Sequence, residues 1–284
     1  MKRAAVVVTG TSTGIGASTA VHLVEKGFHV FGSVRRTEDG DRLRKQLGDA
    51  FTPLHFDVTD RDAIERAAAE VDTALDGATL AGLVNNAAMA TGGPLAHVPL
   101  DDFRQLLEVN LIGVIAVTQE FLPLLGCDRA RTGRPGRIVN ISSVGGKRAM
   151  PFMAPYSASK HALEAVSESL RRELLLFGID VIVVGPGAVA TPIWDKAREI
   201  DNTAYRETEY APAVARFVAY VTDTGPKGDP PERIARVIHE ALTAPSPKTR
   251  YAPVHGKFMN WVLPALLPKR FVDRKIGRAL GLLK

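Results

Sequence analysis

The sequence of 284 residues contains a single cysteine, Cys127. One cysteine cannot close an intramolecular disulfide, which excludes a disulfide framework and is typical of a reducing compartment. Long apolar runs are also missing: none approaches the ~18 residues of a membrane-spanning helix, and the first, Ala4–Val8, is too short for a secretory leader. We therefore expect a cytoplasmic protein.

Over most of the chain, neither positive nor negative charge is in large excess. Lys and Arg number 36 against 31 Asp and Glu, a net charge of +5. Seven basic residues and one acid fall in residues 256–284, so this segment carries +6 and the rest about −1. The body of the protein therefore does not have the charge of a nucleic-acid-binding fold, and we expect no nucleic-acid partner.

Short apolar runs alternate with longer stretches of helical periodicity. The runs are typical of strands buried on both faces of a parallel sheet, and they are Ala4–Val8, Val30–Val34, Leu80–Val84, Arg137–Ile141 and Asp180–Val184. The helical stretches are residues 15–26, 38–47, 60–75, 101–125, 156–177 and 231–243. This alternation predicts an α/β fold, a Rossmann-type doubly wound parallel sheet that binds ligands at the carboxyl ends of its strands.

We expect a single dinucleotide-binding catalytic domain over residues 1–255, followed by a basic amphipathic extension over residues 256–284. Residues 188–228 are rich in glycine, proline and polar side chains, which predicts a mobile excursion beside the substrate. The extension is typical either of a helix packed on its own domain or a neighbouring subunit, or of peripheral membrane contact.

A glycine-rich loop follows the first predicted strand and opens a predicted helix. Gly10, Gly14 and Gly16 are spaced as G-x-x-x-G-x-G, with Ser12, Thr13 and Ile15 between them. Glycine lets the backbone approach a phosphate closely, and the free N–H groups of a helix start favour a pyrophosphate. The placement between strand and helix favours a dinucleotide site over a plain tight turn.

The second predicted strand ends at Val34 and is followed by Arg35 and Arg36. A carboxylate at this position would bind the ribose hydroxyl of NAD, whereas a guanidinium suits a 2′-phosphate, so we favour NADP(H) over NAD(H). Two solvated arginines at a helix start are the alternative. Asp57 and Val58 follow the third strand, where Asp57 either holds the adenine amino group or caps a turn.

Tyr156 and Lys160 lie four residues apart at the start of a predicted helix, and therefore on one face of it. A cation at ~4 Å lowers the pKa of a phenol by up to ~3 pH units from its ordinary ~10, which predicts a proton donor near neutral pH. Taken alone, the pair is more often a surface feature of a helix.

Two further polar residues make the pair more specific. Ser143 follows the fifth predicted strand, where its hydroxyl is expected beside the phenol; Ser142 is the competing candidate. Asn110 lies in an apolar helical setting, where it either holds a water behind Lys160 or is satisfied locally and bends the helix.

In these residues the chain resembles the short-chain dehydrogenase/reductase family over about residues 3–255. The resemblance rests on Thr9–Gly16, Asp57-Val58, Asn85-Asn86-Ala87-Ala88, Asn110, Ser143, Tyr156 with Lys160, and Pro186-Gly187 followed by Thr191. It implies a catalytic tetrad of Asn110, Ser143, Tyr156 and Lys160. Tyr156 would be the acid/base and Ser143 the ligand of the substrate oxygen. Lys160 would lower the phenol pKa and bind the nicotinamide ribose, and Asn110 would support a proton-relay water.

The resemblance also implies the cofactor contacts. Pro186, Gly187, Val189 and Thr191 would flank the nicotinamide, while Asn86 and Ala87 would lie on the adenosine side. Two residues depart from the family pattern. Ala88 occupies a position where the family usually has glycine, and Thr13 occupies one where NADP-dependent members often carry a basic residue. The 2′-phosphate prediction therefore depends on Arg35 and Arg36 alone.

The expected substrate is an alcohol or carbonyl compound that is lipophilic. The apolar side chains predicted around it are Met150, Phe152, Met153, Ile193, Trp194 and Phe217. Pro151-Phe152 and Thr191-Pro192-Ile193-Trp194 resemble the retinol- and hydroxysteroid-dehydrogenase branch. Residues 101–125 and 156–177 carry apolar faces. In the family that the chain resembles, such faces usually build a dimer or tetramer, so the resemblance implies a homodimer or homotetramer. The alternative function is a non-catalytic nucleotide sensor or scaffold on the same fold.

Overall fold

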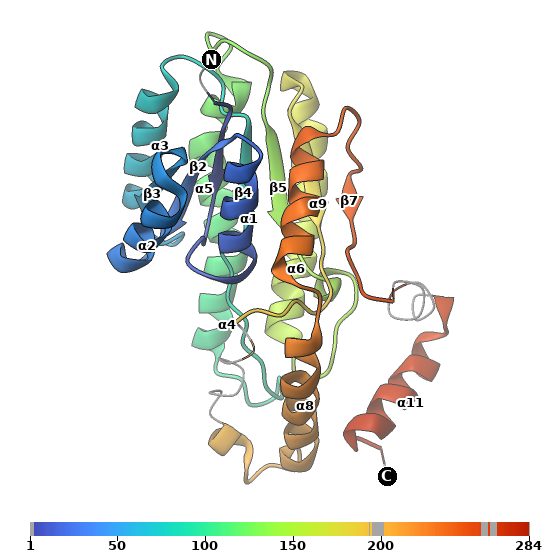
Figure 1. Cartoon of the computed structure of the whole chain (residues 1–284). Coiled ribbons are helices and arrows are strands. Elements are labelled where there is room, and N and C mark those ends of the chain that lie inside the picture. Colours follow the sequence, from blue (N-terminus) through green and yellow to red (C-terminus); the bar gives the residue numbers. More distant parts are fainter. Residues whose placement is uncertain (1–2, 193, 195–201, 257–260, 262–265, 284) are drawn as a thin grey trace.

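The computed structural model describes residues 3–192, 194, 202–256, 261 and 266–283. Seven parallel strands form one sheet in the order β3-β2-β1-β4-β5-β6-β7 (Figure 1). The strands are β1 (Ala5–Val8), β2 (His29–Val34), β3 (Phe51–His55), β4 (Gly82–Asn85), β5 (Arg137–Ile141), β6 (Asp180–Val184) and β7 (Arg250–Tyr251). The strand order reverses between β1 and β4, which is where a doubly wound sheet opens a crevice for a ligand. The predicted fold class is confirmed.

Helices cover both faces of the sheet (Figure 1). One apolar core lies under α1 (Gly14–Glu25), α2 (Thr37–Leu47) and α9 (Pro231–Thr243). The other lies under α3 (Arg61–Leu75) and α5 (Gly113–Phe121), with α6 (Ala154–Glu173) packed at its edge through Leu170. In β1, Val6 and Val8 enter the first core and Val7 the second, so both faces of the strand are buried.

The predicted helix over residues 101–125 is divided. α4 (Leu100–Leu107) passes through a π-helical turn at Glu108–Ile112 into α5. A π turn inserts an extra residue into a helix and is frequent at functional sites. Here it carries Asn110, which is fully buried.

The excursion over residues 188–228 is more regular than the sequence predicts. It contains the helix α8 (Ala211–Thr224), which buries Ala213, Val214 and Phe217. The sequence analysis missed the helix over residues 211–224, because the surrounding glycines and prolines obscured an apolar stripe of helical spacing. The mobility of the excursion stays a prediction. Residues 195–201 lie outside the described residues.

The described part of the C-terminal extension ends in α11 (Lys269–Leu280). Its Ile276 and Leu280 pack into a third apolar cluster with α8 and Phe152. α11 and α8 lie together at one end of the molecule (Figure 1). Among the described helices, none combines the length and the apolar character that crossing a bilayer requires.

Candidate active site

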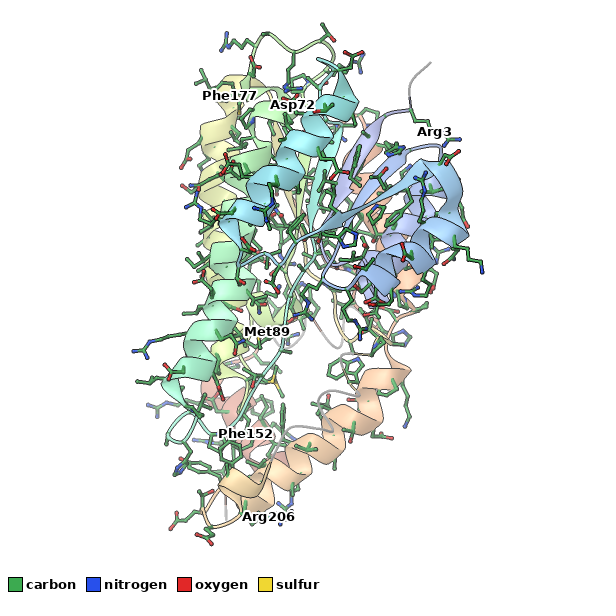
Figure 2. The ribbon with its side chains drawn as sticks, turned by 90° about the vertical axis from the view of Figure 1, so that its left-hand side faces the viewer. Arg3, Asp72, Met89, Phe152, Phe177 and Arg206 are labelled. Atoms are coloured by element: carbon green, nitrogen blue, oxygen red, sulfur yellow. The ribbon has the colours of Figure 1, made fainter. Side chains whose placement is uncertain are left out.

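A cavity of about 1610 Å³ runs along the carboxyl ends of the strands, from the glycine-rich loop to α8 and α11. Met89 and Phe152 line it, and they lie far from Arg3, which precedes the amino end of β1 (Figure 2). Most predicted site residues line this cavity. Of those that the structure describes, Gly16, Arg36 and Asn110 do not.

The glycine-rich loop is packed too closely to accept side chains. Gly10 has a φ of +69°, and a Cβ there would lie 2.9 Å from the Cα of Ala87. A Cβ on Gly16 would overlap the carbonyl of Gly10 and approach the Asn86 amide nitrogen to 2.6 Å. Asn86 fixes the loop, because its Nδ2 donates to the carbonyls of Thr9 at 2.9 Å and Gly10 at 3.1 Å.

The amino end of α1 faces the cavity through Ser12, Thr13, Gly14 and Ile15. Among the described residues, the Thr13 side chain makes no capping hydrogen bond and the first turn carries no acidic residue. The first N–H groups of a helix need partners and attract anions. The loop and the helix end therefore fit the pyrophosphate of a dinucleotide.

Two residues that the sequence analysis missed support this loop. Ser33 Oγ accepts a hydrogen bond from the Gly10 N–H at 2.9 Å and also lines the cavity. Arg42 on α2 donates to the Ser12 carbonyl at 2.6 Å. An arginine in a polar helix carries no sequence signal for this contact, because it depends on how α2 folds back beside the loop.

Arg35 and Arg36 differ in their surroundings. Arg35 lines the cavity, with Nη1 3.6 Å from Asp57 Oδ2. Arg36 pairs with Asp39 at 3.2 Å and is not among the residues that line the cavity. Asp57 also lines the cavity but caps a turn, where Oδ1 accepts hydrogen bonds from both the N–H and the hydroxyl of Thr59. Of these two arginines, Arg35 alone lines the cavity.

Ser143, Tyr156 and Lys160 converge on the cavity wall. The Ser143 and Tyr156 side chains lie together beside Gly145, where the Ser143 hydroxyl lowers the pKa of the phenol by hydrogen bonding. Ser143 Oγ also accepts from the Gly145 N–H at 3.0 Å. The Lys160 ammonium lies 5.9 Å from the centroid of the Tyr156 ring. These residues come from the end of β5 and the first turns of α6, the placement that the sequence predicts. Ser142 is buried, and its hydroxyl has no hydrogen-bond partner in the part of the chain that the structure describes, which leaves Ser143 as the serine beside the phenol.

The predicted lowering of the phenol pKa is wrong for the polypeptide alone. Burial raises the pKa of Tyr156, and the hydrogen bond from Ser143 opposes this rise. Burial also lowers the pKa of Lys160 to about 8. The Lys160 ammonium donates to the Ile141 carbonyl at 2.9 Å. Both groups are thus shifted toward their neutral forms, because desolvation outweighs their attraction.

Asn110 is satisfied by the backbone of Met89. Its Oδ1 accepts from the Met89 N–H at 2.8 Å, and its Nδ2 donates to the Met89 carbonyl at 2.9 Å and to Ser159 Oγ at 3.2 Å. The side chain therefore ties the π turn to the cavity-lining segment after β4 and to α6. Its role with a relay water stays a prediction.

The segment after β6 forms the opposite wall. Pro186, Gly187, Val189 and Thr191 line the cavity, as do Asn86, Ala87 and Val58. The Pro186 carbonyl accepts from the Val144 N–H at 2.9 Å, which joins this segment to the serine loop. Gly14 lies close to Thr191, since a Cβ on Gly14 would come within 3.1 Å of its methyl group.

The far end of the cavity is lined by apolar side chains. Those that the sequence analysis named and the structure describes are all there: Met150, Phe152, Met153, Trp194 and Phe217. Ile193 lies outside the described residues. Leu267, Val272 and Ile276 add a wall from the extension, which the sequence analysis did not assign to the site.

Known proteins share this architecture. A family model described as short chain dehydrogenase matches residues 4–202. The NADPH-dependent 3-dehydrocapnine reductase of Ornithobacterium rhinotracheale is 38% identical and covers 94% of each chain. Human retinol dehydrogenase 5 is 33% identical over 94% of this chain and 86% of its own. A short-chain dehydrogenase structure from Streptomyces avermitilis covers 98% of both chains, with a TM-score of 0.76 and 30% identity.

The fold, the site and these similarities define an oxidoreductase that acts on CH–OH groups. The chain belongs to the short-chain dehydrogenase/reductase family. It interconverts alcohols and carbonyl compounds, and its substrate is a small molecule.

Proposed function

We propose that the protein is an NADP(H)-dependent oxidoreductase that interconverts a lipophilic carbonyl compound and its alcohol, with Tyr156 as the acid/base. The convergence of Ser143, Tyr156 and Lys160 in a cavity that continues from the glycine-rich loop carries this proposal. Its test is turnover by Tyr156→Phe, given in the Discussion.

Each side chain has one task in this mechanism. The glycine-rich loop and the segment after β6 would hold the dinucleotide, whose nicotinamide would supply or accept the hydride at the carbonyl carbon. During reduction, the Tyr156 hydroxyl donates its proton to the carbonyl oxygen, and Ser143 donates a hydrogen bond to the same oxygen. The Lys160 ammonium stabilises the phenolate that results, and Asn110 holds the π turn in place behind α6. Oxidation of the alcohol runs through the same contacts in reverse.

The apolar far end of the cavity supports a lipophilic substrate. Phe152 packs edge-to-face on Phe217, with ring centroids 5.6 Å apart, and Leu267, Val272 and Ile276 line the facing wall. Apolar walls of this kind recognise a substrate by its buried surface. A sensor or scaffold has no need of a buried lysine beside a half-buried tyrosine, since burying the lysine costs free energy.

The placement of Arg35 supports NADP(H). The 3-dehydrocapnine reductase is named as NADPH-dependent, and an actinorhodin polyketide ketoreductase structure with NADPH is 31% identical with a TM-score of 0.76, covering 92% of this chain and all of its own. A 2′-phosphate at Arg35 would replace Asp57 as partner of the guanidinium.

Arg35→Ala is expected to weaken NADPH binding roughly tenfold and to leave NADH binding unchanged, since an exposed guanidinium contributes little more than this. Quenching of protein fluorescence by each nucleotide measures both affinities. Arg36→Ala is the matched control, because its side chain pairs with Asp39 outside the cavity lining. Equal losses of affinity for NADPH and NADH would refute the proposed contact between Arg35 and the 2′-phosphate.

We also propose peripheral contact of α11 with an anionic membrane surface. Phe271, Arg274, Lys275 and Arg278 are exposed and fall on one face of the helix, on the side opposite the buried Leu280. Phe271 is 46% exposed, and the Lys275 ammonium lies 5.7 Å from its ring centroid. A basic helical face with an aromatic side chain is typical of helices that lie on anionic lipid.

The variant Arg274→Glu, Lys275→Glu, Arg278→Glu is expected to lose binding to vesicles that contain phosphatidylglycerol by at least about 100-fold, at ~1 kcal/mol per cation. Co-sedimentation measures it. The matched control, Lys26→Glu, Lys45→Glu, Arg66→Glu, changes the net charge equally on exposed residues of the body. Equal sedimentation of the two variants, or equal binding to uncharged phosphatidylcholine vesicles, would refute the contact.

Assembly into a homodimer or homotetramer and residence in the cytoplasm stay predictions. Leu175 and Leu176 at the end of α6 are 73% and 69% exposed, and they are apolar residues that a subunit interface would cover.

A further inference from the structure

A buried carboxylate lies next to the site and has no part in the mechanism above. Glu164 is on α6, one turn after Lys160, and only 7% of its surface is exposed. A buried carboxylate is costly unless it is paired and hydrogen-bonded. Its partners therefore indicate what it is for.

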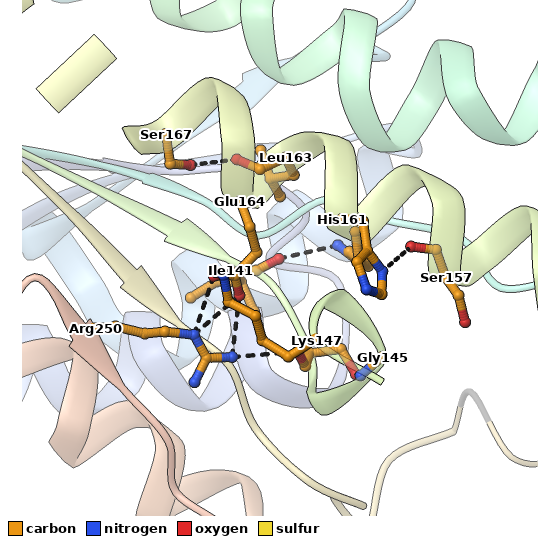
Figure 3. Close-up of polar contacts among 11 residues, drawn as sticks. Ile141, Gly145, Lys147, Ser157, His161, Leu163, Glu164, Ser167 and Arg250 are labelled. Atoms are coloured by element: carbon orange, nitrogen blue, oxygen red, sulfur yellow. Dashed lines mark hydrogen bonds and ion pairs between the residues drawn. The ribbon is translucent and has the colours of Figure 1, made fainter. Parts of the chain in front are cut away.

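Glu164 joins three segments of the chain (Figure 3). Arg250 on β7 donates from Nε to both carboxylate oxygens at 3.0 Å, and its Nη2 lies 3.0 Å from Oε1. Lys147, on the loop that follows Ser143, lies 3.3 Å from Oε2. The carboxylate thus holds α6, the edge strand and the serine loop together.

Arg250 extends this network to Ser143 itself. Its Nη2 donates to the Ser143 carbonyl at 3.4 Å. Gly185, at the end of β6, leaves room for the guanidinium, since a Cβ there would lie 2.9 Å from Arg250 Cζ. The ring of Trp261 covers the guanidinium at 5.0 Å. The Arg250 side chain is therefore restrained on several sides, and it contacts the backbone of the residue whose hydroxyl meets Tyr156.

We propose that Glu164 and Arg250 are positioning residues, which hold the serine loop against α6 so that the Ser143 hydroxyl stays on Tyr156. The inference rests on the proposed function of Tyr156 and Ser143 and adds a determinant of their geometry. Glu164 and Tyr156 are on one helix, while Ser143 is on a loop, so contacts between the helix and the loop fix their separation. The Lys160 ammonium on the Ile141 carbonyl is one such contact, and the Glu164–Arg250 network is a second that reaches the backbone of Ser143 itself. A displacement of ~1 Å at a reacting group lowers the reaction rate by up to ~100-fold.

The pH dependence separates this role from a direct effect of charge. Removing the Glu164 charge through space would favour the Tyr156 phenolate and lower its pKa. Releasing the Ser143 hydrogen bond, which lowers the pKa of Tyr156, would instead raise it. The other ionisable cavity-lining groups on α6 and the serine loop are Lys147, Arg148, Lys160 and His161, and they are unchanged in Glu164→Gln.

The test compares Glu164→Gln and Arg250→Lys with Glu168→Gln and Arg172→Lys. The control pair is an exposed glutamate–arginine pair on the same helix. The substrate is whichever of retinol, a hydroxysteroid or menthol the wild type oxidises fastest. For both site variants we expect kcat to fall roughly 10- to 100-fold with NADPH affinity unchanged, and the acidic limb of the kcat profile to move to higher pH. The control variants are expected to match the wild type.

An unchanged kcat in folded Glu164→Gln would overturn the proposal. A shift of the acidic limb of the kcat profile to lower pH would also overturn the proposal. The Glu164 charge, and not the position of Ser143, would then control the pKa of Tyr156. If Glu164→Gln does not fold, Arg250→Lys decides the question, since it keeps the charge and loses only the forked contact. Turnover by Tyr156→Phe would refute the proposed function itself, an outcome distinct from either of these.

Discussion

Tyr156→Phe is expected to lower kcat by about 100- to 10,000-fold, because the substitution removes the proton that the carbonyl oxygen must receive. NADPH binding stays near that of the wild type, since the ring and its packing against Gly145 are kept. Turnover is followed by NADPH absorbance with retinal, a ketosteroid or menthone, and binding by fluorescence.

Tyr205→Phe is the matched control for this variant. Tyr205 is a buried tyrosine that packs near Gly93 and Phe152 and is not among the residues that line the cavity. We expect it to retain turnover. Turnover near the wild-type level in Tyr156→Phe would refute the acid/base assignment.

Lys160→Met is expected to abolish turnover and to stabilise the fold. The difference between the ordinary pKa of 10.5 and the folded value of about 8 corresponds to about 3 kcal/mol at neutral pH. The lost hydrogen bond to the Ile141 carbonyl offsets about 1 kcal/mol of this, which leaves a gain of about 2 kcal/mol in the free energy of unfolding. Urea unfolding at pH 7 measures it.

The pH dependence of stability checks the cause of that gain. Because the folded-state pKa of Lys160 lies below its unfolded value, the cost of burying the charge is complete below about pH 8 and disappears as the pH rises to 10.5. The gain of Lys160→Met over the wild type should therefore shrink across this range. Lys45→Met, on an exposed lysine of α2, should show no gain. A less stable Lys160→Met at pH 7 would contradict the burial cost.

The sequence predicts those helices and strands whose burial leaves a regular pattern of apolar residues. Strands such as β1 and β6 are covered on both faces and appear as continuous apolar runs. Helix α3 shows its buried stripe and its Asp60 cap. The position of Ser143 beside Tyr156 follows from the parallel sheet, because the end of β5 and the start of α6 meet at one edge.

Features that depend on distant contacts leave no such pattern. β7 has only two residues, and Arg250 meets Glu164 across 86 positions of sequence. The sign of the Tyr156 pKa change depends on burial of the phenol, which raises the pKa, and on the hydrogen bond with Ser143, which lowers it by less. Neither is encoded in the four-residue spacing of Tyr156 and Lys160.

The distance from the Tyr156 hydroxyl to the nicotinamide C4 atom, in a crystal structure of the complex with NADP⁺, tests the central claim most directly. A carbonyl carbon in reach of C4, with its oxygen hydrogen-bonded to the phenol, requires a separation of about 4–6 Å. We predict a distance in this range, with the pyrophosphate on the glycine-rich loop. A phenol directed away from the ring, or a nucleotide bound elsewhere, would contradict the account.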